Sequence, residues 1–319
     1  MTGEIMTRKK IALIGAGNIG GSMAHLCLLK GLGDVVLFDV IDGLPQGKAL
    51  DLSHAGPVEG FDGNVIGTNK YDDIAGADVC IVTAGIARKP GMSRDDLVGT
   101  NAKIISSVAE GIKKHAPDSF VIVVTNPLDA MVTLIKRVTG FPKNRVVGQS
   151  GILDSSRYRS FIAKELNVSV TSVAAMVLGG HGDDMVPVRS TCLVGGVPVE
   201  KLIPAKRLDE IEARVRNAGG EVIALLKTGS AYFSPASAAI RMTEAYFFDK
   251  KEILPCAALL EGEYGVNGYY FCVPVVIGAA GVEKIIDINL SAADKKAFDE
   301  SLNHVKDIVQ AMDRILAAA

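Results

Sequence analysis

The sequence predicts an α/β protein, with a doubly wound parallel sheet in the first half and a smaller α+β unit in the second. Short apolar runs alternate with helical patterns over residues 10–148, as in successive βαβ units. The core is aliphatic, since 48% of the 319 residues are hydrophobic, only 5% are aromatic and tryptophan is absent. That balance is typical of parallel strands buried on both faces.

The first predicted strand, residues 10–14, leads into a glycine-rich turn and then into a helical pattern. This order is the context in which a glycine triplet binds a dinucleotide, as in the Rossmann fold. Gly15 would permit the tight turn, Gly17 would let the backbone approach a pyrophosphate, and Gly20 would allow close packing of the helix on the strand. The residues expected to bind the cofactor here are Gly15, Ala16, Gly17, Asn18, Ile19 and Gly20.

A second strand, residues 35–39, ends in Asp39 about 20 residues after the glycine turn. A carboxylate at this position can accept hydrogen bonds from an adenosine ribose and would repel a 2′-phosphate. The sequence therefore favours NAD over NADP. The alternative role for Asp39 is to cap the following loop.

Further strands are expected at 64–67, 78–83, 120–125 and 145–148, separated by helices such as 101–115 and 128–139. Ligands of such sheets bind at the carboxyl ends of the strands, which directs attention to residues 83–85 and to Val124, Thr125 and Asn126. Asn126 is placed to hold both substrate and nicotinamide. Its alternative role is a turn before Pro127.

Residues 87–96 form a polar loop with proline and glycine in its middle. We expect a lid at the binding edge of the sheet, on which Arg88 and Arg94 fold over an anionic substrate and exclude water. The alternative is a solvated loop whose charges only keep it soluble.

Residues 148–182 hold an acid, an arginine and a histidine. Asp154 and Arg157 are three positions apart, which places both side chains on one face of a helix. His181 lies between glycines that would let the backbone present its imidazole to a cleft. The alternative for the first two is a surface ion pair.

The second half predicts shorter strands at 173–178, 189–194 and 268–277, with two long helices. We expect a cofactor-binding domain over 1–151 and a substrate-binding, catalytic domain over 152–319. Apolar stripes on the two helices indicate core or subunit contact. The first stripe comprises Leu208, Ile211, Val215, Val222 and Leu225, and the second Phe298, Leu302, Val305, Val309, Met312 and Leu316.

Composition argues against several classes of protein. With 34 basic and 36 acidic residues the net charge is −2, and no basic block favours a nucleic-acid partner. No apolar run approaches the roughly 18 residues of a membrane span. Five scattered cysteines without a Cys-x-x-Cys pair indicate reduced thiols and no metal site. The first seven residues resemble neither a signal peptide nor a transit peptide, so the cytoplasm is the expected compartment.

Together the motifs resemble those of the lactate/malate dehydrogenase family, and within it the lactate-dehydrogenase-like malate dehydrogenases. The likeness runs nearly end to end and is specific through the combination of motifs. Those motifs are the turn at 15–20, Asp39, the loop Arg-Lys-Pro-Gly-Met-Ser-Arg at 88–94, Val-Thr-Asn-Pro at 124–127, Leu-Asp-Ser-Ser-Arg at 153–157 and Gly-His-Gly at 180–182. Gln149 and Ser150 depart from the commonest pattern.

The resemblance implies a role for each matching residue. His181 would donate and accept the proton, and Asp154 would hydrogen-bond its other ring nitrogen. Arg157 would bind the substrate carboxylate in a bidentate pair, and Arg94 would polarise the carbonyl. Asn101 and Asn126 would join the cofactor and substrate contacts, with the Val124 carbonyl near the carboxamide. The family also suggests a homodimer or homotetramer.

Arg88 carries the prediction of substrate. The resemblance implies that the corresponding position holds an arginine in the malate enzymes of the family and a glutamine in many of its lactate enzymes. A second substrate carboxylate requires a second cation once water is excluded, because an unpaired buried charge is costly. The implied reaction is reversible, NAD-dependent oxidation of malate to oxaloacetate, although neighbouring Lys89 is an alternative cation.

Three alternatives remain open. A lactate dehydrogenase would use the same catalytic set, but Arg88 argues against it. An NAD-dependent glycoside hydrolase would need metal ligands, and no cysteine lies near His181 in the sequence. A non-catalytic NADH-binding module would not need the arginines, Asp154 and His181 at these spacings.

Overall fold

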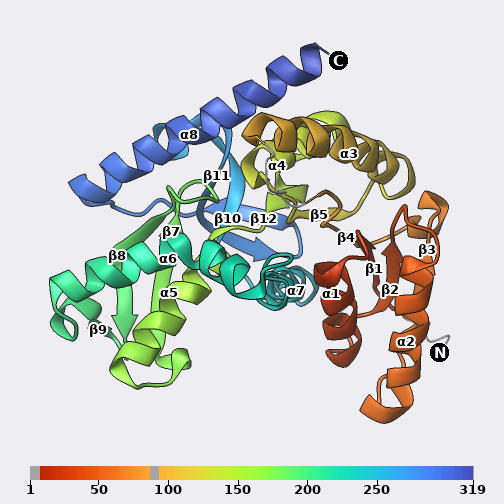
Figure 1. Ribbon diagram of the computed structural model, residues 1–319, viewed down its shortest axis with the longest axis horizontal. Coiled ribbons are helices and arrows are strands. Elements are labelled where there is room, and N and C mark those ends of the chain that lie inside the picture. Colours follow the sequence, from red (N-terminus) through yellow and green to blue (C-terminus); the bar gives the residue numbers. More distant parts are fainter. Residues whose placement is uncertain (1–7, 87–92, 319) are drawn as a thin grey trace, which may run out of the picture.

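A single twisted sheet forms the centre of the protein in a computed structural model, which describes residues 8–86 and 93–318; the side chain of Arg94 is also outside the described set. The strand order is β12-β11-β10-β6-β5-β4-β1-β2-β3, with helices on both faces (Figure 1). The strands of this sheet are β1 (Lys10–Ile14), β2 (Asp34–Phe38), β3 (Val65–Thr68), β4 (Val79–Val82), β5 (Phe120–Val123), β6 (Val146–Gly148), β10 (Glu252–Glu261), β11 (Asn267–Gly278) and β12 (Gly281–Ile285).

The first six strands are all parallel to their neighbours in the order β3-β2-β1-β4-β5-β6. This is the doubly wound arrangement that the sequence predicts, so the predicted fold class is confirmed. Strand β1 pairs with both β2 and β4, and the chain crosses to opposite faces of the sheet on the two sides of β1. Such a switch point leaves a crevice at the carboxyl ends of the strands, where ligands bind.

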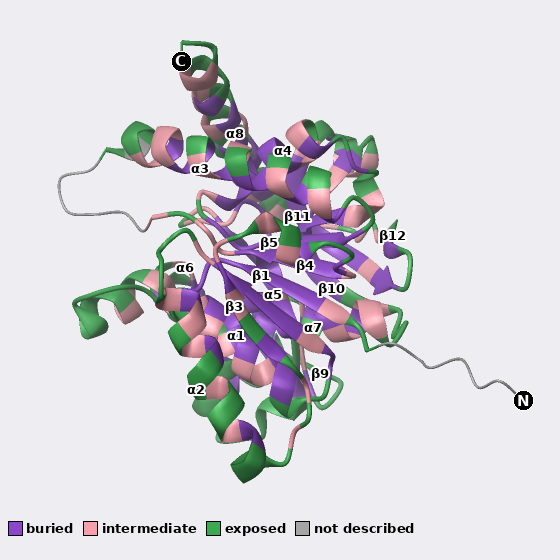
Figure 2. Ribbon diagram, turned by 90° about the vertical axis from the view of Figure 1, so that its right-hand side faces the viewer, coloured by how far each residue is buried: buried purple, intermediate pink, exposed green. Residues whose placement is uncertain are grey.

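The helices form a layer on each face of the sheet. Helices α3 and α4 pack together on one face, and α1 packs against α7 on the other (Figure 1). Their bounds are α1 (Asn18–Leu29), α2 (Leu44–Glu59), α3 (Arg94–His115), α4 (Leu128–Thr139) and α7 (Phe233–Phe247). In Figure 2 the central strands β1, β4 and β5 are almost entirely buried, whereas the helices are exposed on their outer sides.

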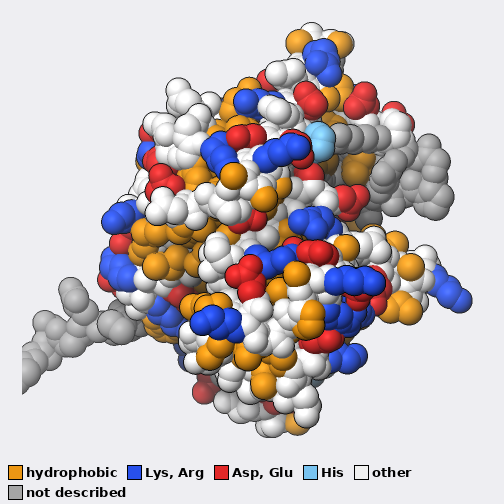
Figure 3. Space-filling model, turned by 90° about the vertical axis from the view of Figure 1, so that its left-hand side faces the viewer, with side chains coloured by type: hydrophobic (Ala, Val, Ile, Leu, Met, Phe, Trp, Pro, Cys, Tyr) orange, Lys and Arg blue, Asp and Glu red, His pale blue; other side chains and the backbone are white. Residues whose placement is uncertain are grey.

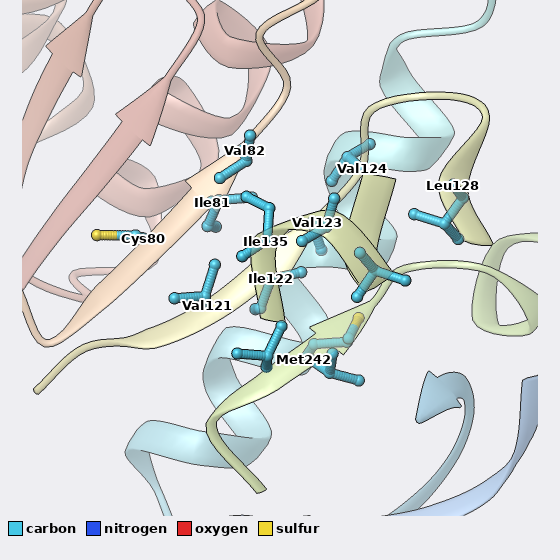
Figure 4. Close-up of a cluster of buried hydrophobic side chains, with 14 of the residues drawn as sticks. Cys80, Ile81, Val82, Val121, Ile122, Val123, Val124, Leu128, Ile135 and Met242 are labelled. Atoms are coloured by element: carbon cyan, nitrogen blue, oxygen red, sulfur yellow. The ribbon is translucent and has the colours of Figure 1, made fainter. Parts of the chain in front are cut away.

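Aliphatic side chains fill the space between these layers. Figure 4 shows the centre of this core, where Ile81 of β4 and Ile122 of β5 lie near Ile135 of α4 and Met242 of α7. All four side chains are fully buried. Burial of such side chains contributes roughly 1.5–3 kcal/mol each, which is the main force that holds the helices on the sheet.

Helix α3 is longer than the sequence analysis predicted. It begins at Arg94 rather than Asn101, because Ser93 is its N-cap and forms a capping box with Asp96. The Ser93 hydroxyl accepts a hydrogen bond from the Asp96 amide at 3.1 Å, and the Asp96 carboxylate accepts one from the Ser93 amide at 3.1 Å. The predicted start at Asn101 is therefore wrong, and part of the predicted polar loop is helix.

Strands from the second half of the chain extend the same sheet. Strand β10 pairs antiparallel with β6 through Ala257 and Gly148, and β11 and β12 follow as antiparallel neighbours. The sequence analysis assigned the predicted strand at 268–277 to a second unit and did not identify β10. Pro255 and Pro274 face each other in the β10–β11 register, and proline within a strand weakens the strand signal.

A smaller antiparallel sheet, β7-β8-β9, packs with helices α5 and α6. It joins the main sheet through an isolated bridge between Gly179 and Cys272. The bounds are α5 (Gly151–Leu166), β7 (Val173–Leu178), β8 (Val186–Val194), β9 (Val197–Pro198) and α6 (Ala205–Leu226). Short 3-10 helices connect several elements: η1 (Tyr71–Ile74), η2 (Lys143–Arg145), η3 (Val170–Ser172), η4 (Val199–Lys201) and η5 (Glu263–Gly265).

The predicted apolar stripe on α6 is buried only in part. Leu208, Ile211 and Val215 are core residues, whereas Leu225 is 76% exposed. The core interpretation is therefore confirmed for the first half of the stripe. At Leu225 the alternative of a subunit contact stays a prediction.

The last helix, α8 (Ala292–Ala317), packs across α3 and α4. The members of its predicted stripe from Phe298 to Met312 are buried, and Leu316 packs against the core while partly exposed. The Phe298 ring meets that of Phe271 on β11 edge to face, with centroids 4.7 Å apart. The predicted core role of this stripe is confirmed, and α8 connects α3 to the second half of the chain.

The surface carries mixed charge. On the face shown in Figure 3, Lys and Arg side chains alternate with Asp and Glu. Within residues 8–86 and 93–318 no helix combines the length and apolarity that a membrane crossing requires.

Candidate active site

The glycine turn lies at the switch point between β1 and α1. Gly15 has φ +113°, and a Cβ there would come within 2.6 Å of Thr83 Oγ1. A Cβ on Gly20 would lie 1.9 Å from the Gly15 carbonyl oxygen, so close packing excludes any side chain at this position. A Cβ on Gly17 would meet nothing within 4 Å. The turn thus leaves open space at Gly17, where α1 begins with unpaired amides that suit the phosphates of a dinucleotide.

Asp39 lies at the end of β2 beside this turn. Its Oδ2 accepts a hydrogen bond from the Ala16 amide at 2.7 Å, and its Oδ1 accepts one from the Ile41 amide at 3.0 Å. The alternative role predicted for Asp39, capping the next loop, is therefore present in the structure. A carboxylate has about four acceptor sites, so these bonds leave capacity for a ribose hydroxyl.

Lys48 of α2 also contacts the turn, and the sequence analysis missed it. Its ammonium donates a hydrogen bond to the Gly17 carbonyl at 2.8 Å. Burial lowers the pKa of Lys48, and the charge of Asp39 partly opposes that effect. Because this hydrogen bond joins residues 31 positions apart, no local motif could have identified it.

The carboxyl ends of β4 and β5 are tied together behind the turn. Thr125 Oγ1 donates to the Ala84 carbonyl at 2.7 Å. Asn101 is fully buried, and its amide group donates to the carbonyls of Ile86 and Asn126 at 3.1 and 2.7 Å. Both Asn101 donors are therefore used on the protein backbone, which favours positioning of these loops over direct contact with a ligand.

A cavity of about 730 Å³ opens where these strand ends meet the second half of the chain. Of the residues predicted to contact cofactor or substrate, Ile19, Val124, Asn126, Arg157 and His181 line it. Ser230 and Ala231, on the connection between α6 and α7, line it as well. The cavity therefore joins the nucleotide turn to the histidine.

His181 and Asp154 meet at the inner wall of this cavity. The His181 Nδ1 lies 2.8 Å from Asp154 Oδ2, and Asp154 is 1% exposed. An ionised carboxylate can only accept hydrogen bonds, so Nδ1 carries the proton and Nε2 is left to take or give one. The sequence placed these residues 27 positions apart, and the fold brings them together.

Arg157 completes this cluster from the next turn of α5. Its Nη1 donates to Asp154 Oδ1 at 2.8 Å, and its side chain is 16% exposed. The shared helix face is confirmed, but the alternative of a surface ion pair is wrong, because Asp154 is buried. Arg157 also lines the cavity, so the rest of its planar guanidinium can face an anionic ligand.

Two opposing effects act on the imidazole. Burial lowers the pKa of His181, but the charge of Asp154 and the hydrogen bond to it outweigh burial, so the pKa is raised overall. Folding therefore favours the protonated ring. This contribution to stability is fully present below the usual pKa of His and is lost as the pH rises through the raised value.

Helix α8 holds the loop that carries His181. The Ser301 hydroxyl accepts a hydrogen bond from the Gly180 amide at 2.9 Å and donates one to Asp184 Oδ2 at 3.1 Å. The His304 Nδ1 lies 3.1 Å from the same Asp184 oxygen. The sequence analysis missed these contacts, which join residues more than 115 positions apart.

A cysteine also lies beside this loop, although none is near it in the sequence. The backbone of Cys272 exchanges hydrogen bonds with Gly179 at 3.1 and 3.3 Å. Burial raises the pKa of the Cys272 thiol to about 12, so it is protonated at neutral pH. Within the described part of the chain, no group of three or more His, Cys, Asp or Glu side chains is arranged to hold a metal ion.

The predicted lid falls largely outside the described residues. Arg88 and Lys89 lie in the stretch 87–92 and cannot be placed, and only the backbone of Arg94 is described, as the first residue of α3.

Two family models, one for each domain of the same family, match the chain. The "lactate/malate dehydrogenase, NAD binding domain" matches residues 9–148, and the "lactate/malate dehydrogenase, alpha/beta C-terminal domain" matches residues 152–315. The chain belongs to the lactate/malate dehydrogenase family. The family and the NAD cofactor that the sequence analysis predicted are thereby confirmed.

Malate dehydrogenases and lactate dehydrogenases of this family are both similar to the chain. A malate dehydrogenase of Geobacter sulfurreducens is 59% identical over 316 residues, which cover 96% of the chain and 100% of the relative. A crystal structure of Cryptosporidium parvum malate dehydrogenase has a TM-score of 0.94 at 45% identity, covering 97% of this chain and 100% of that one. A lactate dehydrogenase of the same organism, complexed with lactic acid and NAD, has a TM-score of 0.94 at 48% identity, covering 97% and 99%. Similarity of fold alone therefore does not distinguish the two activities.

The two glycines of the turn provide a test of the cofactor site. Gly17→Ala adds a methyl group to open space, so we expect unchanged thermal stability but NADH binding weaker by about tenfold, roughly 1.4 kcal/mol. Gly20→Ala is the matched control for fold, because its methyl group would clash with the Gly15 carbonyl and lower the melting temperature. Fluorescence titration with NADH and thermal melts measure both effects. Unchanged NADH affinity in Gly17→Ala would contradict this assignment of the site.

Proposed function

We propose that the protein is an NAD-dependent malate dehydrogenase that catalyses the reversible oxidation of (S)-malate to oxaloacetate. The reaction class rests on one observation: a buried Asp154 is hydrogen-bonded to both His181 and Arg157 beside the NAD-binding turn. The substrate rests on Arg88 and on the curated relatives. Relatives that are 57–59% identical over at least 95% of the chain are named malate dehydrogenases.

In the proposed mechanism the chain moves a proton while hydride is transferred. NAD, when bound, accepts or returns the hydride. His181 takes the hydroxyl proton of malate at Nε2, and in the reverse direction it protonates the oxygen that forms. Asp154 fixes the ring tautomer and stabilises the imidazolium, as its 2.8 Å contact with Nδ1 supports. Arg157 binds the carboxylate next to the reacting carbon.

The remaining site residues keep the roles that the sequence predicts, with one change. Arg94 polarises the substrate carbonyl, Arg88 pairs with the second carboxylate, and Asn126 contacts substrate and nicotinamide. The backbone of Val124 and Thr125 contacts the cofactor. We now propose that Asn101 positions these loops from behind, since both of its amide hydrogens bond to backbone carbonyls.

The proposal also covers the division into domains, the oligomeric state and the cellular compartment. The chain divides into an NAD-binding domain over 1–151 and a substrate-binding domain over 152–319. It forms a homodimer or homotetramer, and exposed apolar residues such as Leu225 and Phe233 are available for such contacts. It acts in the cytoplasm, which is compatible with five free, buried thiols.

Changes to Asp154 and His181 test the proton-transfer pair. Asp154→Asn keeps the shape but removes the charge that stabilises the imidazolium, so we expect kcat to fall by roughly 10²–10⁴-fold. His181→Asn should lose at least as much, while NADH affinity stays nearly unchanged in both. Asp209→Asn, at an exposed ion pair with Arg189, serves as the control and should keep full activity. Normal turnover by His181→Asn would remove this residue from the mechanism.

A comparison of substrates tests the proposed function itself. We expect a higher kcat/KM for oxaloacetate than for pyruvate when NADH oxidation is followed with the purified enzyme. A preference on the order of hundredfold is expected, because charge-assisted hydrogen bonds contribute about 1.5–3 kcal/mol each. Preference for pyruvate would instead establish a lactate dehydrogenase. Binding of NADH without turnover of either acid would establish a non-catalytic module.

Arg88 is tested by exchange for glutamine. Arg88→Gln removes the cation for the second carboxylate, so the ratio of kcat/KM values should shift toward pyruvate by about tenfold or more. Lys89→Gln is the matched neighbour and should leave the ratio nearly unchanged. Equal losses of kcat/KM on both substrates in Arg88→Gln would show that Arg88 does not select the substrate. A shift of the ratio only in Lys89→Gln would assign that role to Lys89.

A further inference from the structure

A second carboxylate, that of Asp129, is hydrogen-bonded to the histidine loop. Asp129 lies in the first turn of α4, just after the strand end that carries Asn126. It is 3% exposed, and its Oδ2 accepts a hydrogen bond from the backbone amide of His181 at 3.0 Å. One residue is thus bound on its ring by Asp154 and on its main chain by Asp129.

The other oxygen of Asp129 is buried and lacks a hydrogen-bond partner among the described atoms. Asp129 lines the same cavity as His181 and Arg157. Leaving a buried carboxylate oxygen unpaired is unfavourable, because the oxygen loses its hydrogen bonds to water without a replacement. A carboxylate without a cationic partner would repel an anionic substrate in this cavity unless a nearby positive charge balances it.

Cations are distributed unequally between the two acids. Asp154 forms an ion pair with Arg157 at 2.8 Å. Among the lysine and arginine side chains that the structure describes, none forms an ion pair with Asp129. The charge of Asp154 is therefore partly balanced by Arg157, whereas Asp129 is hydrogen-bonded to the His181 main chain and is influenced by the charge of the His181 ring.

We propose that Asp129 is a positioning residue for proton transfer, which fixes the His181 main chain and supplies the negative charge that stabilises the imidazolium beyond the Asp154–Arg157 pair. The inference rests on the proposed function, because it concerns the proton that His181 exchanges with the substrate. It adds a residue to the machinery from a helix that follows the substrate-contact motif at Asn126.

The charged and titratable groups around Asp129 agree with this role. Burial raises the pKa of Asp129 to about 6, the hydrogen bond and charge of His181 lower it, and Asp184 raises it. In return, Asp129 is among the groups that raise the pKa of His181, whereas Arg157 lowers it. The Cys272 thiol, whose pKa Asp129 helps to raise, stays neutral. Removal of the Asp129 charge therefore lowers the pKa of His181.

Asp129→Asn tests this inference, because its side-chain oxygen can still accept the His181 amide hydrogen bond while the charge is lost. Reduction of oxaloacetate requires protonated His181, so its kcat/KM falls as the pH rises through the pKa of that residue. In the variant this limb should move to lower pH by about one unit. The rising limb for malate oxidation should move in the same direction, and KM should change less than kcat.

Asp78→Asn is the matched control, since Asp78 also accepts a backbone hydrogen bond, from the Lys10 amide at 2.8 Å, but does not line the cavity. Its pH profile should coincide with that of the wild type. A loss of rate in Asp129→Asn that is equal at every pH would indicate a merely structural role and overturn the inference. A wild-type enzyme without malate turnover would overturn the proposed function instead.

If Asp129→Asn does not fold, the inference is tested by a pH titration of the wild-type protein. The His181 signal of ¹³C-histidine-labelled enzyme, assigned by its absence in His181→Asn, should show two inflections as the pH changes. One reports the ring itself and the other its coupling to Asp129. Both His181 and Asp129 are expected to titrate between about pH 4 and about pH 9. A single inflection of the His181 signal over this range would contradict the inference.

Discussion

The burial of Asp154 is the constraint on which the rest of the active site depends. An ionised carboxylate that is 1% exposed is stable only when its oxygens are paired. Arg157 pairs with one oxygen and the His181 ring with the other, each at 2.8 Å. The same two bonds fix the imidazole tautomer and hold the guanidinium at the cavity. The two hydrogen bonds that stabilise the buried carboxylate therefore also set the ring orientation that the proposed proton transfer requires.

The sheet brings this cluster to the cavity that the glycine turn also borders. The parallel strands end at the switch point, where Gly20 packs so closely on Gly15 that no side chain fits. Strand β10 pairs with β6, so the second half of the chain is joined to the same sheet. The bridge between Gly179 and Cys272 then sets where the histidine loop begins. Backbone pairing within one sheet therefore connects the glycine turn to the segment that carries His181.

The histidine loop is also held from two further helices. Ser301 of α8 binds the Gly180 amide, and Asp129 of α4 binds the His181 amide. Helix α8 also packs on α3 and so connects the histidine loop to that helix. The loop has glycines at 179, 180 and 182, and these external bonds supply the order that its own backbone lacks.

The sequence by itself determined the fold class, the family and the NAD cofactor, because these depend on local order: strand, glycine turn, helix, and an acid and an arginine one helical turn apart. It also placed Asp154, Arg157 and His181 in one site, through resemblance. Only the tertiary structure decided that Asp154 is buried, that Asn101 bonds to backbone, and that Lys48, Asp129 and Ser301 support the site. Those contacts join residues 15 to 121 positions apart. No local pattern encodes them, since they exist only once sheet and helices have brought distant segments together.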